Sequence, residues 1–227
     1  MRRRRFTKAL LAAGAMLAGG SRAAGISDAD AASGIRAALE RGAGAAVDQL
    51  GRTDGFLGNP KVKIPLPGYL KDVSKLARLT GQQKQVDDLV TAMNRAAEAA
   101  VPEAKTLLVS AVKSMSVDDA RRIVSGGDDS VTKFFAVKTR QPLGEKFLPI
   151  VTVQTEKVSL AQKYNAVAGQ ASGFGLVKKE DANVQQYVTG KTLDGLYYMI
   201  GEEEKKIRKD PVGTGSELLK KVFGSLG

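Results

Sequence analysis

The chain has 227 residues, and its 35 Lys and Arg outnumber its 24 Asp and Glu to give a formal net charge of +11. Cysteine and histidine are absent, which excludes disulfides, thiol nucleophiles and zinc–thiolate sites and removes the commonest general base and metal ligand. Tryptophan is absent as well, and the few aromatic residues and abundant alanine favour helices that pack closely through small side chains.

The first residues combine a basic start with a short apolar run. Residues 2–8 are mostly arginine and lysine, and residues 9–20 are small or apolar. Such a run is too short to cross a bilayer, which takes about 20 residues. Small residues then occupy Ser21 and Ala23, as cleavage after Ala23 requires. This order is typical of a secretory signal peptide, so we predict that residues 1–23 are removed on export to the periplasm.

Four residues of this segment indicate the export route. Arg3, Arg4, Phe6 and Lys8 match the twin-arginine consensus R-R-x-F-x-K, whose cargo crosses the membrane already folded. A general secretory signal that is rich in arginine is the alternative. A lipid anchor is excluded, because lipoprotein attachment needs a cysteine.

Removal of the signal segment lowers the net charge of the chain. The first 23 residues hold six basic and no acidic residues, so the mature chain has a net charge of +5. That value is modest for a mature chain of this length, and nucleic acid is not an expected partner. The expected partners are the export machinery and either an envelope protein or a small apolar ligand.

Apolar residues recur at helical spacing through most of the mature chain, which predicts an all-α fold. The first helix follows Ser27 as its N-cap and ends at Gly51. Residues 52–68 are dense in Gly and Pro and show a strand-like alternation. Since Pro65 and Pro67 lack backbone donors, we expect an extended segment laid over the helices and no central strand.

Helices are predicted over residues 69–80 and 83–115. The apolar stripe of the second keeps its phase across Pro102, and Val101 would be a poor cap for a new helix. The pattern therefore favours one helix kinked at Pro102 over two helices.

Local signals mark the later helices. Ser116 with Asp119 resembles a capping box that begins a short helix ending at residues 126–127, and Asp129 or Ser130 caps the next. A new helix is expected to begin at Pro142, since proline favours the first turn of a helix. Residues 150–155 are predicted to be helical, although their β-branched side chains would suit a strand. The remaining expected elements are a helix at 159–171, a break at 172–175, a long helix at 181–209 and a short helix at 217–223. No repeat or linker is visible, so residues 24–227 are expected to form a single irregular helical bundle.

Three groups of motifs resemble one known family. They are DGFL (54–57) with IPLP (64–67), MNRAAE (93–98) with VPEA (101–104), and YVT (187–189) followed by LDGL (193–196) and EEEKKIR (202–208). In this order they resemble the exported bacterial family catalogued as domain of unknown function 4197, over about residues 26–223. The resemblance implies an all-helical envelope protein and carries over no reaction or catalytic residue. Members often have a lipoprotein cysteine, and its absence here favours a soluble form.

Polar residues on the helix over 83–115 form a first candidate site. Asn94 lies at the edge of the apolar stripe, while Arg95 and Glu98 turn away from it. We expect these three residues to form a polar rim that pins a neighbouring helix or loop.

A second candidate site lies on the helix over 181–209. Five residues share one flank beside its core-facing stripe: Tyr187, Gly190, Asp194, Tyr198 and Gly201. A glycine inside a helix costs about 1 kcal/mol relative to alanine, so two on one edge need a reason. We expect a neighbouring helix to cross closely there. The alternative is a groove in which the tyrosine hydroxyls and Asp194 orient a ligand.

At the end of the same helix, Glu202 with Lys206 and Glu204 with Arg208 have the spacing of ion pairs on a solvated surface. The sequence GKT at 190–192 resembles part of a phosphate-binding loop, but Gln185 stands where the first glycine is required. No cofactor or metal site is predicted.

No catalytic constellation is visible, and the sequence favours a non-enzymatic, exported, soluble periplasmic binding or envelope-associated module. The first alternative is a carrier that holds a small apolar ligand or lipid between helices. The second is an enzyme that uses carboxylate and tyrosine chemistry.

Overall fold

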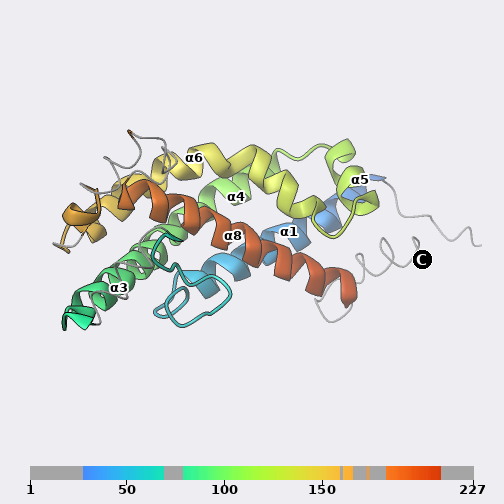
Figure 1. Ribbon diagram of the computed structural model, residues 1–227. Coiled ribbons are helices and arrows are strands. Elements are labelled where there is room, and N and C mark those ends of the chain that lie inside the picture. The colour runs from blue at the N-terminus through green and yellow to red at the C-terminus, as the bar shows by residue number, and fades with distance from the viewer. Residues whose placement is uncertain (1–27, 69–78, 159–160, 166–172, 174–182, 211–227) are drawn as a thin grey trace, which may run out of the picture.

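The computed structural model describes residues 28–68, 79–158, 161–165, 173 and 183–210 (Figure 1). These residues form helices, turns and one short extended stretch, with no strand among them, so the predicted all-α class is confirmed. The expected signal segment, the cap at Ser27 and the helices at 69–80 (up to residue 78) and 217–223 lie outside the described residues.

The first helix, α1, spans Asp28–Leu50 and buries the predicted face at Ile35, Leu39, Ala43, Ala46 and Leu50. Residues 51–62 then form successive turns, and only residues 63–67 are extended, so the extended part is shorter than expected. We call residues 52–68 the strap. Its expected alternation is confirmed, because Val62 and Ile64 are buried whereas Lys61 and Lys63 are exposed.

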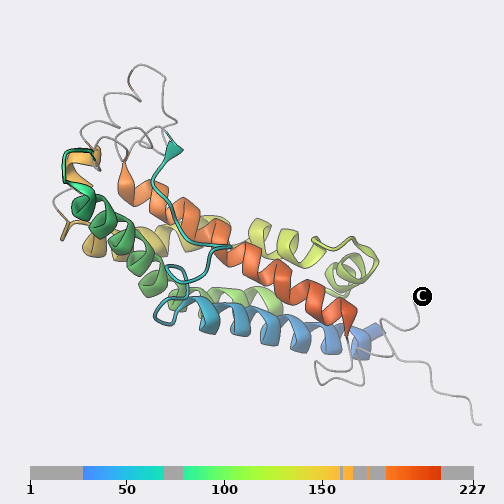
Figure 2. The same cartoon turned by 60° about the horizontal axis from the view of Figure 1, so that its bottom comes forward.

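The region around Pro102 combines both predicted alternatives. The α-helices α3 (Gln83–Ala100) and α4 (Ala104–Lys113) are separate, and the 3-10 turn η2 (Val101–Glu103) joins them. The backbone stays right-handed helical at Val101 and Glu103, but Pro102 has no N–H for the α-helical hydrogen bond. Consequently the chain changes direction between α3 and α4 (Figure 2).

The short helix α5 (Val117–Ser125) confirms the predicted capping box. The Ser116 hydroxyl accepts from the Asp119 backbone N–H at 3.0 Å, and the Asp119 carboxylate accepts from the Ser116 backbone N–H at 3.1 Å. The pKa of Asp119 lies below its usual value, chiefly because of that backbone hydrogen bond. The helix ends before Gly126, as expected.

The expectation of a helix beginning at Pro142 is wrong. A single helix, α6, runs over Ser130–Thr155 and contains both Pro142 and Pro149. An interior proline costs about 3 kcal/mol, but α6 buries Phe135, Leu143 and Phe147 against its neighbours and this packing offsets the cost. The two prolines are seven residues apart and share one side of the helix.

Residues 150–155 are helical, as predicted. The hydroxyls of Thr152 and Thr155 donate to the carbonyl oxygens four residues earlier, each at 2.8 Å. These β-branched residues are therefore satisfied within the helix and need no partner strand.

The last helix, α8, spans Val184–Lys209 and begins three residues later than predicted. The Asn183 side chain caps it by accepting from the Gln186 N–H at 2.7 Å. Residues 161–165 are helical, in line with the prediction for 159–171. Gly173, which lies within the expected break at 172–175, is helical as well, so the expectation fails at that residue.

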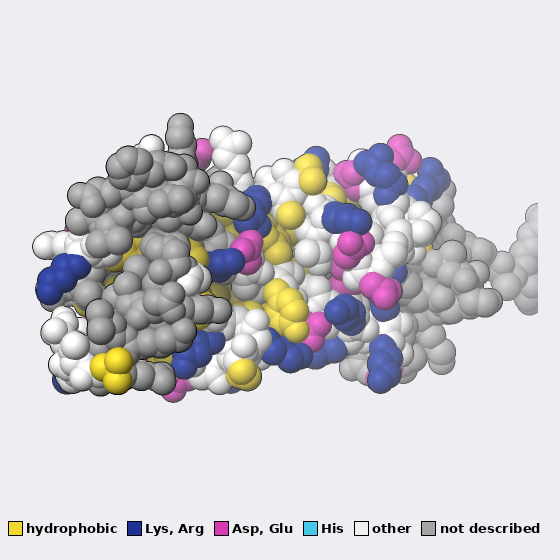
Figure 3. All heavy atoms as spheres, viewed as in Figure 1, with side chains coloured by type: hydrophobic (Ala, Val, Ile, Leu, Met, Phe, Trp, Pro, Cys, Tyr) yellow, Lys and Arg dark blue, Asp and Glu magenta, His cyan; other side chains and the backbone are white. Residues whose placement is uncertain are grey.

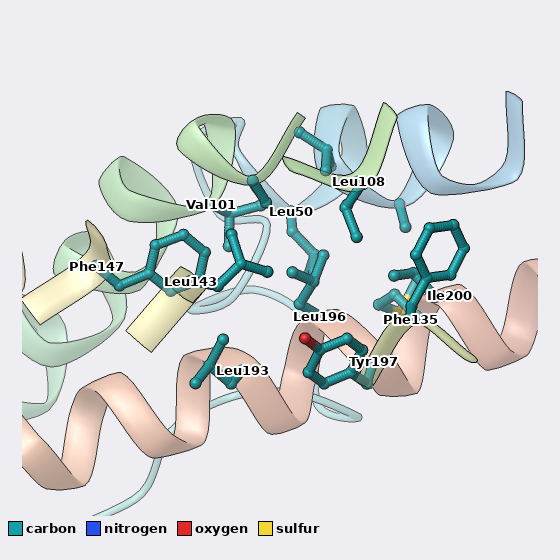
Figure 4. Packing of buried hydrophobic residues seen from close by; sticks show 14 of the residues in the cluster. Leu50, Val101, Leu108, Phe135, Leu143, Phe147, Leu193, Leu196, Tyr197 and Ile200 are labelled. Atoms are coloured by element: carbon teal, nitrogen blue, oxygen red, sulfur yellow. The ribbon is translucent and has the colours of Figure 1, made fainter. Parts of the chain in front are cut away.

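The helices share one core. Helix α8 packs against α6, α1 and α3, and α6 packs in turn against α3 and α4. In Figures 1 and 2, α3 lies at one end of the bundle and α1 and α5 lie toward the other. Figure 4 shows side chains from α1, η2, α4, α6 and α8 meeting in this core: Leu50, Val101, Leu108, Phe135, Leu143, Phe147, Leu193, Leu196, Tyr197 and Ile200.

Candidate functional site

Asn94 of α3 holds the extended part of the strap. Its side chain is fully buried, and its oxygen accepts from the Ile64 N–H at 2.8 Å while its nitrogen donates to the Ile64 carbonyl at 2.9 Å. The same nitrogen donates to the Val90 carbonyl at 2.8 Å. One amide thus satisfies both backbone groups of Ile64, as a neighbouring strand would, and fixes the strap against α3.

Glu98 and Arg95 hold the turns of the strap. One oxygen of Glu98 accepts from the backbone N–H groups of Phe56 and Leu57, each at 3.0 Å, and the other accepts from Arg95 at 2.6 Å. Arg95 also donates to Asp54 at 2.8 Å, and these partners raise its pKa, chiefly through the hydrogen bond to Glu98. The predicted polar rim thus binds the strap. Glu98 was expected to turn away from the core, but its side chain is buried.

Phe56 packs the strap against α8. Its ring is fully buried against Gly195, where an added Cβ would lie 2.7 Å from the nearest ring carbon. A glycine is needed at this position because the ring occupies the space of a side chain. Sequence reasoning missed this contact, although Gly195 stands in the LDGL motif next to the flank residue Asp194.

We expect Gly195→Leu to lower the free energy of unfolding by at least about 1–3 kcal/mol, because the new side chain collides with Phe56. Gly190→Leu is the matched control, since no described atom lies within 4 Å of the Cβ it would carry. Urea denaturation followed by circular dichroism measures both changes. Equal stability of the two variants would contradict the proposed packing at Gly195.

A groove opens between the strap and α8. The strap supplies residues 61–68 as one wall, and α8 supplies Tyr187, Lys191, Asp194 and Tyr198 as the other. Its volume of about 630 Å³ is within the usual range for ligand sites. The two tyrosines are three helical turns apart, so the α8 wall is about 16 Å long. Figure 2 shows the strap running beside α8.

Each tyrosine of the groove has a lysine near its ring. The Lys191 ammonium is 6.0 Å from the centre of the Tyr187 ring, and the Lys61 ammonium is 5.9 Å from that of Tyr198. The Tyr187 hydroxyl donates to the Pro65 carbonyl at 3.0 Å and ties the two walls together. Tyr198 is 41% exposed, so much of its ring is open to a ligand.

Ion pairs occupy the rim of the groove. Lys61 binds Glu202 at 2.9 Å, and this hydrogen bond raises the pKa of Lys61 and lowers that of Glu202. Asp194 binds Arg140 of α6 at 2.7 Å and lies 3.5 Å from Lys191. The expected Glu202–Lys206 pair is not the one found, because Glu202 binds Lys61 and Lys205.

The structure separates the five flank residues predicted on α8. Tyr187, Asp194 and Tyr198 line the groove, but Gly190 and Gly201 do not. A Cβ at Gly190 would meet no neighbouring side chain within 4 Å, whereas a Cβ at Gly201 would lie 3.1 Å from the Thr132 hydroxyl of α6. The expected close crossing therefore occurs at Gly201 alone.

Glu204 is a buried structural residue that the sequence analysis placed in solvent. Its carboxylate accepts from the backbone N–H groups of Val131 and Thr132 at 3.1 and 3.2 Å, and so caps α6 from another helix. Arg208 binds it at 2.9 Å. The sequence did indicate that Glu204 is buried, because it follows Ile200 by four residues and therefore lies on the core-facing stripe of the helix.

The comparisons with known proteins place the chain in a family. Residues 25–224 match the family described as protein of unknown function (DUF4197). The chain belongs to the DUF4197 family. Neither the curated proteins nor the solved structures contain a match to this DUF4197 chain.

The three motif groups of this DUF4197 chain meet at the strap. DGFL and IPLP (54–57 and 64–67) bind MNRAAE (93–98) through Asn94 and Glu98. They touch the α8 motifs through Gly195 and Tyr187. Among the described helices of the DUF4197 chain, none is long and apolar enough to span a membrane.

Proposed function

We propose that this chain is a non-enzymatic binding module of the bacterial envelope, exported by its N-terminal segment, and that its ligand lies in the groove between the strap and α8. The observation that carries the proposal is the fixed groove wall. Buried hydrogen bonds from Asn94 and Glu98 hold the strap in place, and so the groove is formed before a ligand arrives. A preformed site binds with a smaller ordering cost than a site that must fold around its ligand.

The buried carboxylates favour binding over catalysis. Glu98 and Glu204 each accept from two backbone N–H groups and an arginine. Both carboxylates are buried and hold groups of the fold, and neither lines the groove. Asp194, at the groove, is bound by Arg140.

The alternative of an apolar carrier has less support. An apolar cavity lies between α1, α6 and α8, lined in part by Leu39, Phe135 and Ile200. Its free volume of about 30 Å³ is close to that of one water molecule. The groove beside the strap has room for a ligand, and this cavity does not.

Native mass spectrometry of protein purified gently from the periplasm tests the binding function. We expect additional bound mass on the wild-type chain and its loss in Tyr198→Ala with Leu66→Ala, both groove residues. Val137→Ala with Val153→Ala is the control, because both valines are exposed on α6. A bare wild-type chain, or equal mass on all variants, would contradict the groove.

Export through the twin-arginine route predicts that Arg3→Lys with Arg4→Lys abolishes periplasmic accumulation, because the receptor reads guanidinium groups that lysine lacks. Arg2→Lys with Arg5→Lys is the control, since it makes the same changes but keeps the central pair. Immunoblots of periplasmic fractions measure the outcome. Normal accumulation of the first variant would leave general secretion as the route.

A further inference from the structure

The charge of the groove indicates what it binds. Three lysines and a single aspartate line it: Lys61, Lys63, Lys191 and Asp194. Asp194 is already bound by Arg140, and its 3.5 Å distance to Lys191 exceeds that of a strong charge-assisted hydrogen bond. Lys63 is exposed, and no described carboxylate pairs with it. Lys63 and Lys191 can therefore bind an incoming anion.

The shape of the groove indicates the form of the ligand. Its lysines line a concave site about 16 Å long, which a flat bilayer surface cannot enter. An extended peptide covers that length with about five residues. Tyr198, whose ring is partly exposed, lies at one end of the groove. Leu66 follows Pro65 of the strap at the Tyr187 end, so each end offers apolar contact to a side chain of the peptide.

We propose that the groove binds an extended acidic peptide segment of a partner protein, with its carboxylates at Lys63 and Lys191 and its apolar side chains against Tyr198 and Leu66. This inference rests on the proposed function, since it names the ligand of the same groove. The charged rim sets the preference for acidic segments and speeds their capture, because complementary charge chiefly affects specificity and association rate.

Fluorescence anisotropy of the mature chain with a labelled peptide of about six alternating Glu and Leu residues tests the inference. We expect Lys63→Glu with Lys191→Glu to weaken binding about tenfold or more. Lys138→Glu with Lys146→Glu is the control, because these lysines lie on the exposed surface of α6 and give the same change in net charge. The affinity of the control should be within about twofold of that of the wild type. The affinity of the wild type should decrease as the salt concentration rises from about 0.1 to 0.5 M.

Three results would overturn the inference. They are no wild-type binding, equal loss in both double variants, and stronger binding of the matched Lys–Leu peptide or of vesicles of anionic lipid. A Lys–Leu peptide that competes for the groove would overturn the acidic preference but leave the proposed function standing. The bound mass seen by native mass spectrometry tests that function independently.

Discussion

Glu204→Ala is expected to lower the free energy of unfolding by about 3–5 kcal/mol, the largest single effect in this protein. The side chain of Glu204 is 1% exposed and accepts from the first backbone N–H groups of α6. Its removal leaves those donors without a partner in the core. It also removes the carboxylate partner of the largely buried Arg208 cation, which otherwise donates to neutral groups such as the Ile123 carbonyl and the Ser130 hydroxyl.

Urea denaturation followed by circular dichroism measures this loss. Glu203→Ala is the matched control, because the carboxylate of this neighbouring residue pairs with the exposed Lys206 and caps no described helix, so its loss should cost less than that of Glu204. Glu204→Gln keeps the shape and one accepting oxygen, so we expect an intermediate loss. If Glu204→Ala were no less stable than Glu203→Ala, the capping role would be wrong.

Glu98→Ala should lower the free energy of unfolding by about 3 kcal/mol, because it leaves the buried N–H of Phe56 and the Arg95 side chain without their carboxylate. The strap should loosen before the bundle unfolds. Hydrogen exchange measures this directly, and we expect the amides of Phe56 and Leu57 to exchange much faster in the variant.

Glu103→Ala is the control for Glu98→Ala, because Glu103 is exposed in η2 just beyond the same helix. Glu98 does not line the groove, yet its loss should weaken ligand binding by releasing the wall that residues 61–68 form. Unchanged exchange at Phe56 and Leu57 would show that packing of the Phe56 ring alone holds the strap.

Periodicity predicted most helices because burial follows the spacing of apolar residues. The stripe on α3 and α4 places Leu89, Met93, Ala96 and Leu108 in the core, as the structure has them. The capping box at Ser116 was predictable as well, since both of its hydrogen bonds join residues three apart. Local signals of this kind need no knowledge of the rest of the chain.

Pro142 shows where local signals fail. A proline favours the first turn of a helix, and nothing near it in sequence indicates otherwise. The burial of Phe135 on one side of it and Phe147 on the other, against α3 and α8, keeps α6 continuous. That packing energy comes from residues far away in the chain.

The sequence by itself determined the all-α class, the end of α1, the limits of α5, and the segment that could not be a strand, because each depends on contacts within a few residues. The tertiary structure alone decided the roles of Glu98, Glu204 and Gly195. Their partners lie in other elements: Phe56 for Glu98 and Gly195, and the start of α6 for Glu204. A buried carboxylate and an exposed one look alike in a sequence, and only the packing of distant segments around it removes the water that would otherwise bind it.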